Sequence, residues 1–322
     1  MPTIPTLGHN KHLNLKFISC LSVALGLCAC QPSASPPPNA SSTASATNAS
    51  PSISLEKMSK AERDALIAQL MRTAFAEKYN AKLGGARVDL RNHEKGSARS
   101  LYELSPTDIF LLPDQQILLV ANAQGVEDNG EIVVSHASSG LLNLLWFGAG
   151  EKPGTWKVNK RAENIAMLGS HGMFGRAQLS TFADKQSMLT VESGGTWQGY
   201  TVSQLNLFHI TNQAAQGLGS VLIHSDSEGG CVEETEHCWN ISAAWKFVPS
   251  QAGNLPDLQL TISGVDENMP EDSTGGATGG PAGREERQPA TRLSQNVTGS
   301  ARYGVKDGKY VLIQGENIVP SL

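Results

Sequence analysis

Serine and histidine, the residue types of nucleophilic catalysis, stand side by side at two places in the chain. Ser135-His136 and Ser170-His171 each begin the pattern Ser-His-x3-Gly-x3-Leu-x2-Phe, and the two copies are offset by 35 residues. A hydroxyl becomes a nucleophile when a histidine takes its proton. Because neighbouring residues of a strand point to opposite faces, Ser170 and His171 are not expected to act on each other. A hydrolase would therefore need His171 or His136 to meet a distant serine and a carboxylate.

Candidate ligands for a cation are concentrated in the segment that begins at residue 224. His224, Asp226 and Glu228 alternate ahead of two glycines, a pattern similar to the start of an EF-hand calcium loop. The match fails at both ends, because histidine holds the first ligand position and Thr235 stands where that loop has its glutamate. The segment is therefore either a weak cation site or a solvated acidic loop.

Aromatic and amide side chains follow a glycine pair at one point in the chain. Trp197, Gln198 and Tyr200 come directly after Gly194-Gly195. An indole ring offers a large apolar area and one hydrogen-bond donor, so tryptophans can line a ligand cleft as well as pack a sheet. We predict that Trp197, Gln198 and Tyr200 form a recognition edge.

The first 29 residues have the layout of a bacterial secretion signal. Two lysines precede an apolar stretch, Phe17–Ala29, which is too short to span a bilayer permanently. The stretch ends in Leu-Cys-Ala before Cys30, and this ending resembles the lipobox of bacterial lipoproteins. That resemblance implies cleavage before Cys30 and acylation of its thiol. Gln31 after the cysteine, by resemblance to Gram-negative lipoproteins, implies an outer-membrane protein with its domain in the periplasm or at the cell surface.

The segment after the signal predicts a tether followed by one domain. Residues 30–53 comprise the lipidated cysteine and a linker of proline and small polar residues, which offers little to bury. The domain is expected over residues 54–322. Of the three cysteines that remain after processing, acylation occupies Cys30, so the even pair left in an oxidising compartment, Cys231 and Cys238, is predicted to form a disulfide.

The charge balance narrows the choice of partners. The chain has 25 Lys and Arg against 30 Asp and Glu, and removing the signal takes two lysines and no acidic residue, which leaves a net charge of −7. Such a chain has no electrostatic reason to bind nucleic acid or anionic headgroups through its body. We expect membrane contact through acyl chains, and no cofactor is predicted.

The elements that position these residues begin with a helix. Ser59 and Glu62 read as a capping box, and apolar residues then recur at helical spacing as far as Tyr79. From Arg87 onward short apolar or alternating runs are separated by turns, and no helical stretch lies between them, so the sheet should be antiparallel. The clearest runs are 116–122, 131–135, 141–147, 155–160, 176–182, 188–192, 197–209, 220–224, 239–248, 257–263 and 309–315.

The last third of the chain supplies a turn, an insert and a second resemblance. Asp307-Gly308 predicts a hairpin turn, because both residues tolerate positive φ. Residues 265–289 are rich in Gly, Pro and charge, and we predict a flexible insert. The final segments resemble those of bacterial proteins with propeller-type repeats, although the calcium loop of integrin-type blades is absent. We predict a mainly β protein, an antiparallel sandwich or propeller-like domain with one N-terminal amphipathic helix.

These features together favour a tethered protein that binds over one that catalyses. We expect an envelope-anchored lipoprotein that serves as a binding, inhibitor or accessory module for a macromolecular partner, either a protein or a glycan. The alternatives are an envelope hydrolase that uses His171 or His136, and a structural component of an envelope assembly.

Overall fold

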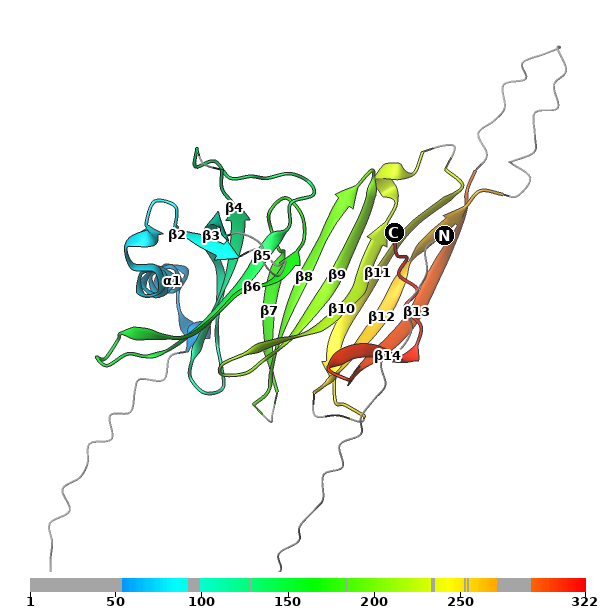
Figure 1. Ribbon diagram of the computed structural model, residues 1–322. Coiled ribbons are helices and arrows are strands. Elements are labelled where there is room, and N and C mark those ends of the chain that lie inside the picture. Colours follow the sequence, from blue (N-terminus) through cyan, green and yellow to red (C-terminus); the bar gives the residue numbers. More distant parts are fainter. Residues whose placement is uncertain are drawn as a thin grey trace, which may run out of the picture. The chain divides into compact units, whose positions relative to one another are not determined.

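The computed structural model describes residues 54–91, 99–127, 129–182, 185–232, 235–251, 253, 255–270 and 291–322 (Figure 1). All of these residues belong to one unit of the chain, Ala49–Leu322. No helix within the described ranges is long and apolar enough to cross a bilayer. The predicted signal, Cys30 and the linker lie outside the described residues, as does most of the predicted insert.

The helix α1 (Lys60–Phe75) begins where the sequence places its cap. The Ser59 hydroxyl accepts from the Glu62 backbone N–H, and the Glu62 carboxylate accepts from the Ser59 N–H at 2.8 Å, so the capping box is confirmed. One stripe of the helix is buried, and it comprises Leu66, Leu70, Met71, Ala74 and Phe75. Three single 3₁₀ turns occur elsewhere: η1 (Leu55–Lys57), η2 (Ala76–Lys78) and η3 (Glu228–Gly230).

Fourteen described strands form two antiparallel sheets in which each strand pairs with the next along the chain. The first sheet has the order β1 (Tyr79–Asn80), β2 (Gly85–Arg91), β3 (Arg99–Leu111), β4 (Ile117–Gly125), β5 (Gly140–Ala149) and β6 (Trp156–Leu168). The second sheet comprises β7 (Arg176–Thr181), β8 (Ser187–Trp197), β9 (Tyr200–Ile210), β10 (Ala215–Asp226), β11 (His237–Val248), β12 (Asp257–Asn268), β13 (Leu293–Lys306) and β14 (Lys309–Gly315).

Three apolar clusters hold these layers together. Helix α1 packs on one face of the six-stranded sheet, where Leu70 contacts the cluster that contains Leu119. The opposite face of that sheet packs on β7–β9, so that Leu118 and Trp146 share a cluster with Phe208. The eight-stranded sheet has a core of its own on its other face, closed in part by Tyr310 and the C-terminal Val319.

The mainly β, antiparallel prediction is confirmed: helix α1 precedes the strands, and the strands form two antiparallel sheets that share an apolar cluster. Sheets of six and eight strands differ from the four-stranded blades of a propeller. The Asp307-Gly308 turn is confirmed, with φ of 52° and 74°. The strand predicted over 131–135 is wrong, since only Ile132 forms a bridge there, and β12 continues to Asn268, beyond the predicted start of the insert.

Two ends of the sheets can be distinguished, because alternate connections of a meander lie at the same end of a sheet. The described residues of four connections lie at one end, at the top of Figure 1, and we call this end the loop end: 126–127, 129–139, 169–175, 198–199, 227–232 and 235–236. The opposite end carries residues 112–116, 182, 185–186 and 211–214. All of the predicted histidine and aromatic sites lie at or near the loop end.

Candidate functional site

The predicted recognition edge is the tight turn that joins β8 to β9. Trp197 pairs with Tyr200 across the turn, and Gln198 and Gly199 both have positive φ, 51° and 87°. A Cβ on Gly199 would lie 2.3 Å from the backbone of Gly229, so this position needs glycine for space as well as for conformation. Trp197 is 41% exposed. The strand predicted over 197–209 included this turn, because neither Trp nor Tyr is typical of a turn.

Behind this turn the structure gathers further aromatic rings that the sequence analysis did not connect. Tyr200 lies 5.7 Å from Trp239, and Trp239 lies 5.0 Å from His237, measured between ring centroids. The Trp239 indole donates to the Ser225 hydroxyl at 2.8 Å, and His237 Nε2 is 2.6 Å from an oxygen of Asp266. His237 and Trp239 are two residues apart on one strand, which is the spacing that places two side chains on one face.

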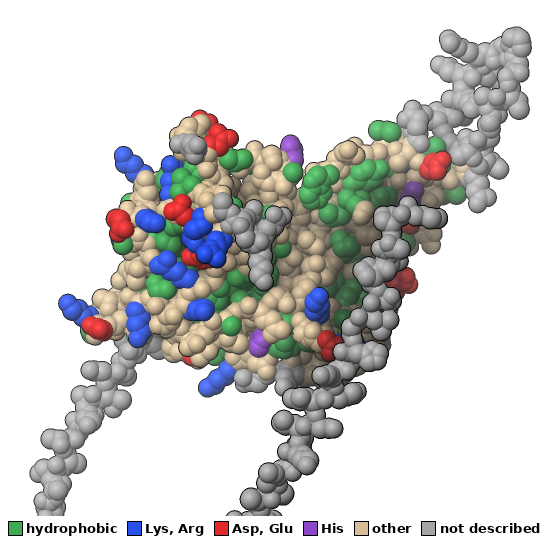
Figure 2. All heavy atoms as spheres, viewed as in Figure 1, with side chains coloured by type: hydrophobic (Ala, Val, Ile, Leu, Met, Phe, Trp, Pro, Cys, Tyr) green, Lys and Arg blue, Asp and Glu red, His purple; other side chains and the backbone are tan. Residues whose placement is uncertain are grey.

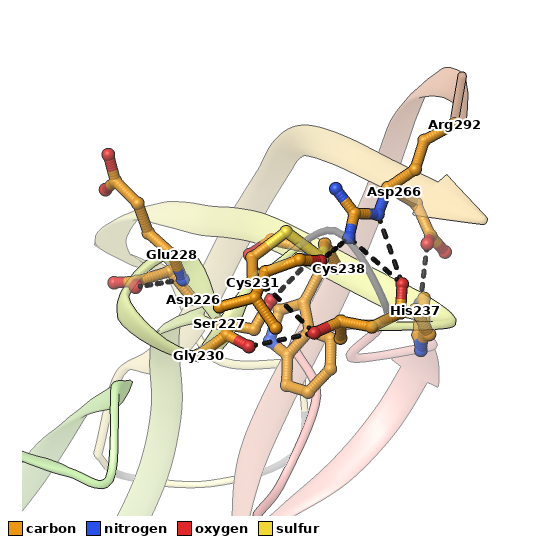
Figure 3. Close-up of a disulfide and its surroundings, with 12 residues drawn as sticks. Asp226, Ser227, Glu228, Gly230, Cys231, His237, Cys238, Asp266 and Arg292 are labelled. Carbon is orange, nitrogen blue, oxygen red and sulfur yellow. Dashed lines mark hydrogen bonds and ion pairs between the residues drawn. A yellow bond between two sulfur atoms is a disulfide. The ribbon is translucent and has the colours of Figure 1, made fainter. Parts of the chain in front are cut away.

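A disulfide closes the adjacent connection (Figure 3). Cys231 and Cys238 are bonded, with their Cα atoms 5.7 Å apart, so the predicted pairing is present. The Arg292 guanidinium donates to the carbonyls of Val232 and Thr235 and so pins the closed segment to the start of β13. A cavity of about 310 Å³ lies against the disulfide, and its lining comprises Ser227, Glu228, Cys231, Cys238, Trp239, Asn240, Val265 and Glu267.

The three predicted cation ligands lie close in space but make other contacts. His224 is engaged at both ring nitrogens, since Nδ1 lies 2.8 Å from the Ser242 hydroxyl and Nε2 lies 2.9 Å from an Asp226 oxygen. The other Asp226 oxygen accepts from the backbone N–H of Glu228, whose own carboxylate extends away from it in Figure 3. Within the described ranges no three His, Cys, Asp or Glu side chains are grouped as a metal site would require. The network therefore fixes the end of β10.

Ser170 and His171 are in contact, although neighbouring residues of a strand would point to opposite faces. His171 has φ of 53°, which turns its ring toward the preceding side chain, and its Nδ1 lies 3.2 Å from the Ser170 Oγ. Ser170 donates its proton to the Gly194 carbonyl at 3.2 Å. Its oxygen is then the acceptor for an N–H at His171 Nδ1. This is the reverse of the proton flow that activates a serine nucleophile.

The two Ser-His turns converge in space. The rings of His136 and His171 contact each other edge to face, with centroids 4.4 Å apart and an interplanar angle of 67°. His136 belongs to the β4–β5 connection of one sheet, and His171 belongs to the connection that leads into the other sheet. The repeated spacing in the sequence marked both turns, but it did not reveal that they touch.

Comparisons with known proteins supply no relatives. No family model, no curated protein and no solved structure matches this chain. Function must therefore be argued from the geometry described above.

Proposed function

We propose that this protein is an envelope lipoprotein whose domain binds a macromolecular partner, a protein or a glycan, through the loop end. In this proposal Cys30 carries the acyl chains, the linker follows it, and the loop end presents Trp197, Gln198 and Tyr200 to the partner. The proposal takes the outer membrane as the site of anchoring, on the strength of the lipobox resemblance and Gln31.

The observation that carries the proposal is that the start of the described chain and the loop end lie at opposite ends of the strands. The described chain begins at Ser54, which lines a cavity with Leu111 and Thr181 near the opposite end. Strands β8 and β9 have 11 residues each, so they separate the two ends by roughly 35 Å at about 3.3 Å per residue. A tether that enters there would hold the loop end away from the lipid surface.

The loop end also has the composition of a recognition surface. Binding energy at interfaces is concentrated in a few well-supported aromatic and arginine side chains. Trp197 is exposed on a turn that packs on η3, and η3 leads directly into the disulfide. Hydrophobic side chains reach the surface over the eight-stranded sheet in Figure 2, whereas Lys and Arg gather over α1 and the six-stranded sheet. A rigid, apolar edge of this kind loses little entropy when a partner binds.

The hydrolase alternative gains no support from the two histidines. The Ser170 hydroxyl donates its only proton to the Gly194 carbonyl, so this proton is not directed to His171. A general base must instead accept the proton of its nucleophile.

Partner capture tests the binding proposal. The protein is cross-linked in intact envelopes and isolated, and the partners are identified by mass spectrometry in parallel for Trp197→Ala, Tyr200→Ala and Leu83→Ala. Leu83 is 43% exposed on the turn between β1 and β2, so it controls for the loss of an exposed apolar side chain. We expect the two loop-end variants to lose a partner that Leu83→Ala retains. Equal capture by all three variants would place recognition elsewhere.

Acylation is tested separately. Cys30→Ser should abolish incorporation of labelled palmitate and release the domain from the membrane fraction. Membrane retention of this variant without label would contradict the lipoprotein assignment, while leaving the binding surface open to test in the released protein.

A further inference from the structure

We propose that His136 and His171 form a binding site for a divalent transition-metal ion at the loop end. The proposal does not depend on the binding function argued above. It rests on the contact between the two rings, on the hydrogen bonds that hold their turns together, and on the contact of His171 Nδ1 with Ser170.

Hydrogen bonds fix the backbones of both turns. The Gly172 N–H donates to the Ser138 carbonyl at 2.7 Å and thereby joins one turn to the other. The Asn122 side chain, which is buried, donates to the Gly172 carbonyl at 2.8 Å. In the first turn the Ser138 hydroxyl accepts from the Ser135 N–H at 3.0 Å. The two histidines are therefore brought together by the fold, and a metal ion does not have to organise the loops.

The environment of His171 leaves one ring nitrogen suited to a metal. Ser170 uses its only proton on the Gly194 carbonyl, so its oxygen accepts from His171 Nδ1. With the proton on Nδ1, the lone pair is on Nε2, the atom that a metal would bind. A partner that fixes the tautomer of a ligating histidine in this way is the common second-shell arrangement of metal sites.

The spacing of the rings fits coordination to a single ion. Two imidazoles that bind one ion at metal–nitrogen distances of about 2.0–2.1 Å place their ring centres roughly 4.5–5.5 Å apart, depending on the angle at the ion. The observed separation of 4.4 Å lies just below this range, so coordination requires only a small movement of the rings apart. Both histidines are exposed, and rotation about χ2 of an imidazole meets only broad energy minima. Rotating the His136 ring alone, to aim a nitrogen at the point that His171 Nε2 faces, leaves the His171–Ser170 hydrogen bond in place and requires no backbone change.

Imidazole nitrogens select Cu²⁺, Ni²⁺ and Zn²⁺ rather than Ca²⁺ or Mg²⁺. The described residues bring no third His, Cys, Asp or Glu side chain into a metal-binding group with the pair. The remaining coordination positions would be open to water or to a donor atom from another molecule. The site is thus distinct from the His224, Asp226 and Glu228 candidate, whose histidine has both nitrogens engaged.

The test is a metal titration of the protein without a polyhistidine tag. Cu²⁺ serves as the probe because it binds nitrogen sites most tightly among these divalent ions. We expect one equivalent to bind in calorimetry, and electron paramagnetic resonance to report two imidazole nitrogens on the copper. His136→Ala and His171→Ala should each lower the affinity by at least tenfold, and Ser170→Ala should lower it by about tenfold, as expected for loss of a second-shell partner.

His209→Ala and His224→Ala are the matched controls, and both should retain the wild-type affinity. Circular dichroism of each variant establishes that the fold is intact. Absence of copper binding, a spectrum with fewer than two imidazole nitrogens, or equal binding by the His136→Ala/His171→Ala double variant would each overturn the proposal. The nitrogen count is taken on the unmutated protein, so it decides the question even if a variant fails to fold.

Discussion

The two sheets bury their strands in different ways. In β4 seven consecutive residues, Ile117 to Ala123, are buried, because α1 covers one face of that sheet and β7–β9 cover the other. In β11 buried and exposed residues largely alternate: Ile241 is buried and Asn240 is exposed. A continuous apolar run therefore marks a strand covered on both faces, and an alternating run marks a strand with one free face.

This difference distinguishes strands that only stabilise the fold from surfaces that a partner could contact. The middle strands of the six-stranded sheet have no free face to offer a partner. In the eight-stranded sheet β8 and β9 are also buried on both faces, but β11 and β12 alternate and keep one face accessible. The disulfide and Trp197 lie at the loop end of this sheet. The comparison predicts that substitutions in the first sheet act on stability, whereas those at the loop end act mainly on binding.

The largest expected effect comes from adjacent leucines in β4. Leu118 and Leu119 are both fully buried but point to opposite faces, toward β7–β9 and toward α1. Leu118→Ala and Leu119→Ala should each lower the free energy of unfolding by about 2–5 kcal/mol, because each leaves a cavity. Urea denaturation followed by circular dichroism measures both.

In β11, by contrast, substitutions of two neighbouring residues should have unequal effects on the free energy of unfolding. Ile241→Ala should cost about 2–5 kcal/mol, whereas Asn240→Ala should change stability by no more than about 0.5 kcal/mol. A small effect at either leucine of β4 would mean that one face of the first sheet is not covered as described.

The disulfide gives an intermediate effect that is confined to the second sheet. Replacing Cys231 and Cys238 together by serine should lower the free energy of unfolding by ~2–3 kcal/mol, because the unfolded chain gains the entropy that a closed loop of this length denies it. Denaturation under non-reducing conditions checks this, with Cys30→Ser as the control for loss of a cysteine outside the sheet. If adding a reductant destabilises the double variant as much as the wild type, the bond is not the source of the effect.

Much of the fold could be predicted from the sequence because its signals are local. The Ser59 capping box, the Asp307-Gly308 turn and the alternation in β11 each depend on a few neighbouring residues, and the structure has all three. The predicted strands do not include β2, β3 or most of β13, and one was placed over 131–135. That segment is apolar, yet Val134 is 49% exposed, and nothing in its composition says that it lacks a covering layer.

The candidate site could be predicted only in pieces. Trp197 and Tyr200 were identified from a glycine pair, but their neighbour Trp239 comes from a strand 39 residues further along. His136 and His171 were identified from a repeat, but their contact depends on a left-handed residue and on hydrogen bonds between two sheets. Long-range contacts of this kind depend on the packing of whole layers, which residue spacing does not encode.

A smaller effect is expected from Tyr310 in the core of the second sheet. Burial, and then the charge of Asp257, raise the pKa of Tyr310, and its hydroxyl donates to the Pro256 carbonyl at 2.6 Å. A tyrosine with a raised folded pKa stabilises fully below its unfolded pKa of about 10 and loses that contribution as the pH rises toward the folded value. Tyr310→Phe should therefore cost about 0.5–1.5 kcal/mol at pH 8 for the lost hydrogen bond.

Urea midpoints measured from pH 8 to pH 11 test the sign of this effect. The difference in urea midpoint between wild type and Tyr310→Phe should narrow above pH 10. There the phenol of unfolded wild type ionises, which favours unfolding, whereas phenylalanine has no such group. A gap that widens with pH would show that the hydroxyl is not buried in the folded protein.

The smallest predicted effect concerns the helix that covers the first sheet. The Ser59 hydroxyl accepts a backbone hydrogen bond at the start of α1, and Ser59→Ala should cost about 1 kcal/mol. Hydrogen bonds from the side chain and then the backbone of Ser59 lower the pKa of Glu62, so the reciprocal half of the box is present above the unfolded pKa of about 4.3 and is lost as the pH falls through the folded value.

Thr73→Ala is the matched control within the same helix, since the Thr73 hydroxyl only donates back to the Gln69 carbonyl. A bond of that kind adds little to a helix, and alanine has the higher helix propensity, so this variant should be neutral or slightly stabilising. Thermal unfolding at pH 7 and at pH 3 compares the two. The difference between Ser59→Ala and wild type should shrink at pH 3, because a protonated Glu62 carboxyl is a weaker acceptor for the Ser59 hydroxyl than the carboxylate is. A difference that does not change with pH would mean that the serine acts alone and the box contributes nothing to the layer that closes the first sheet.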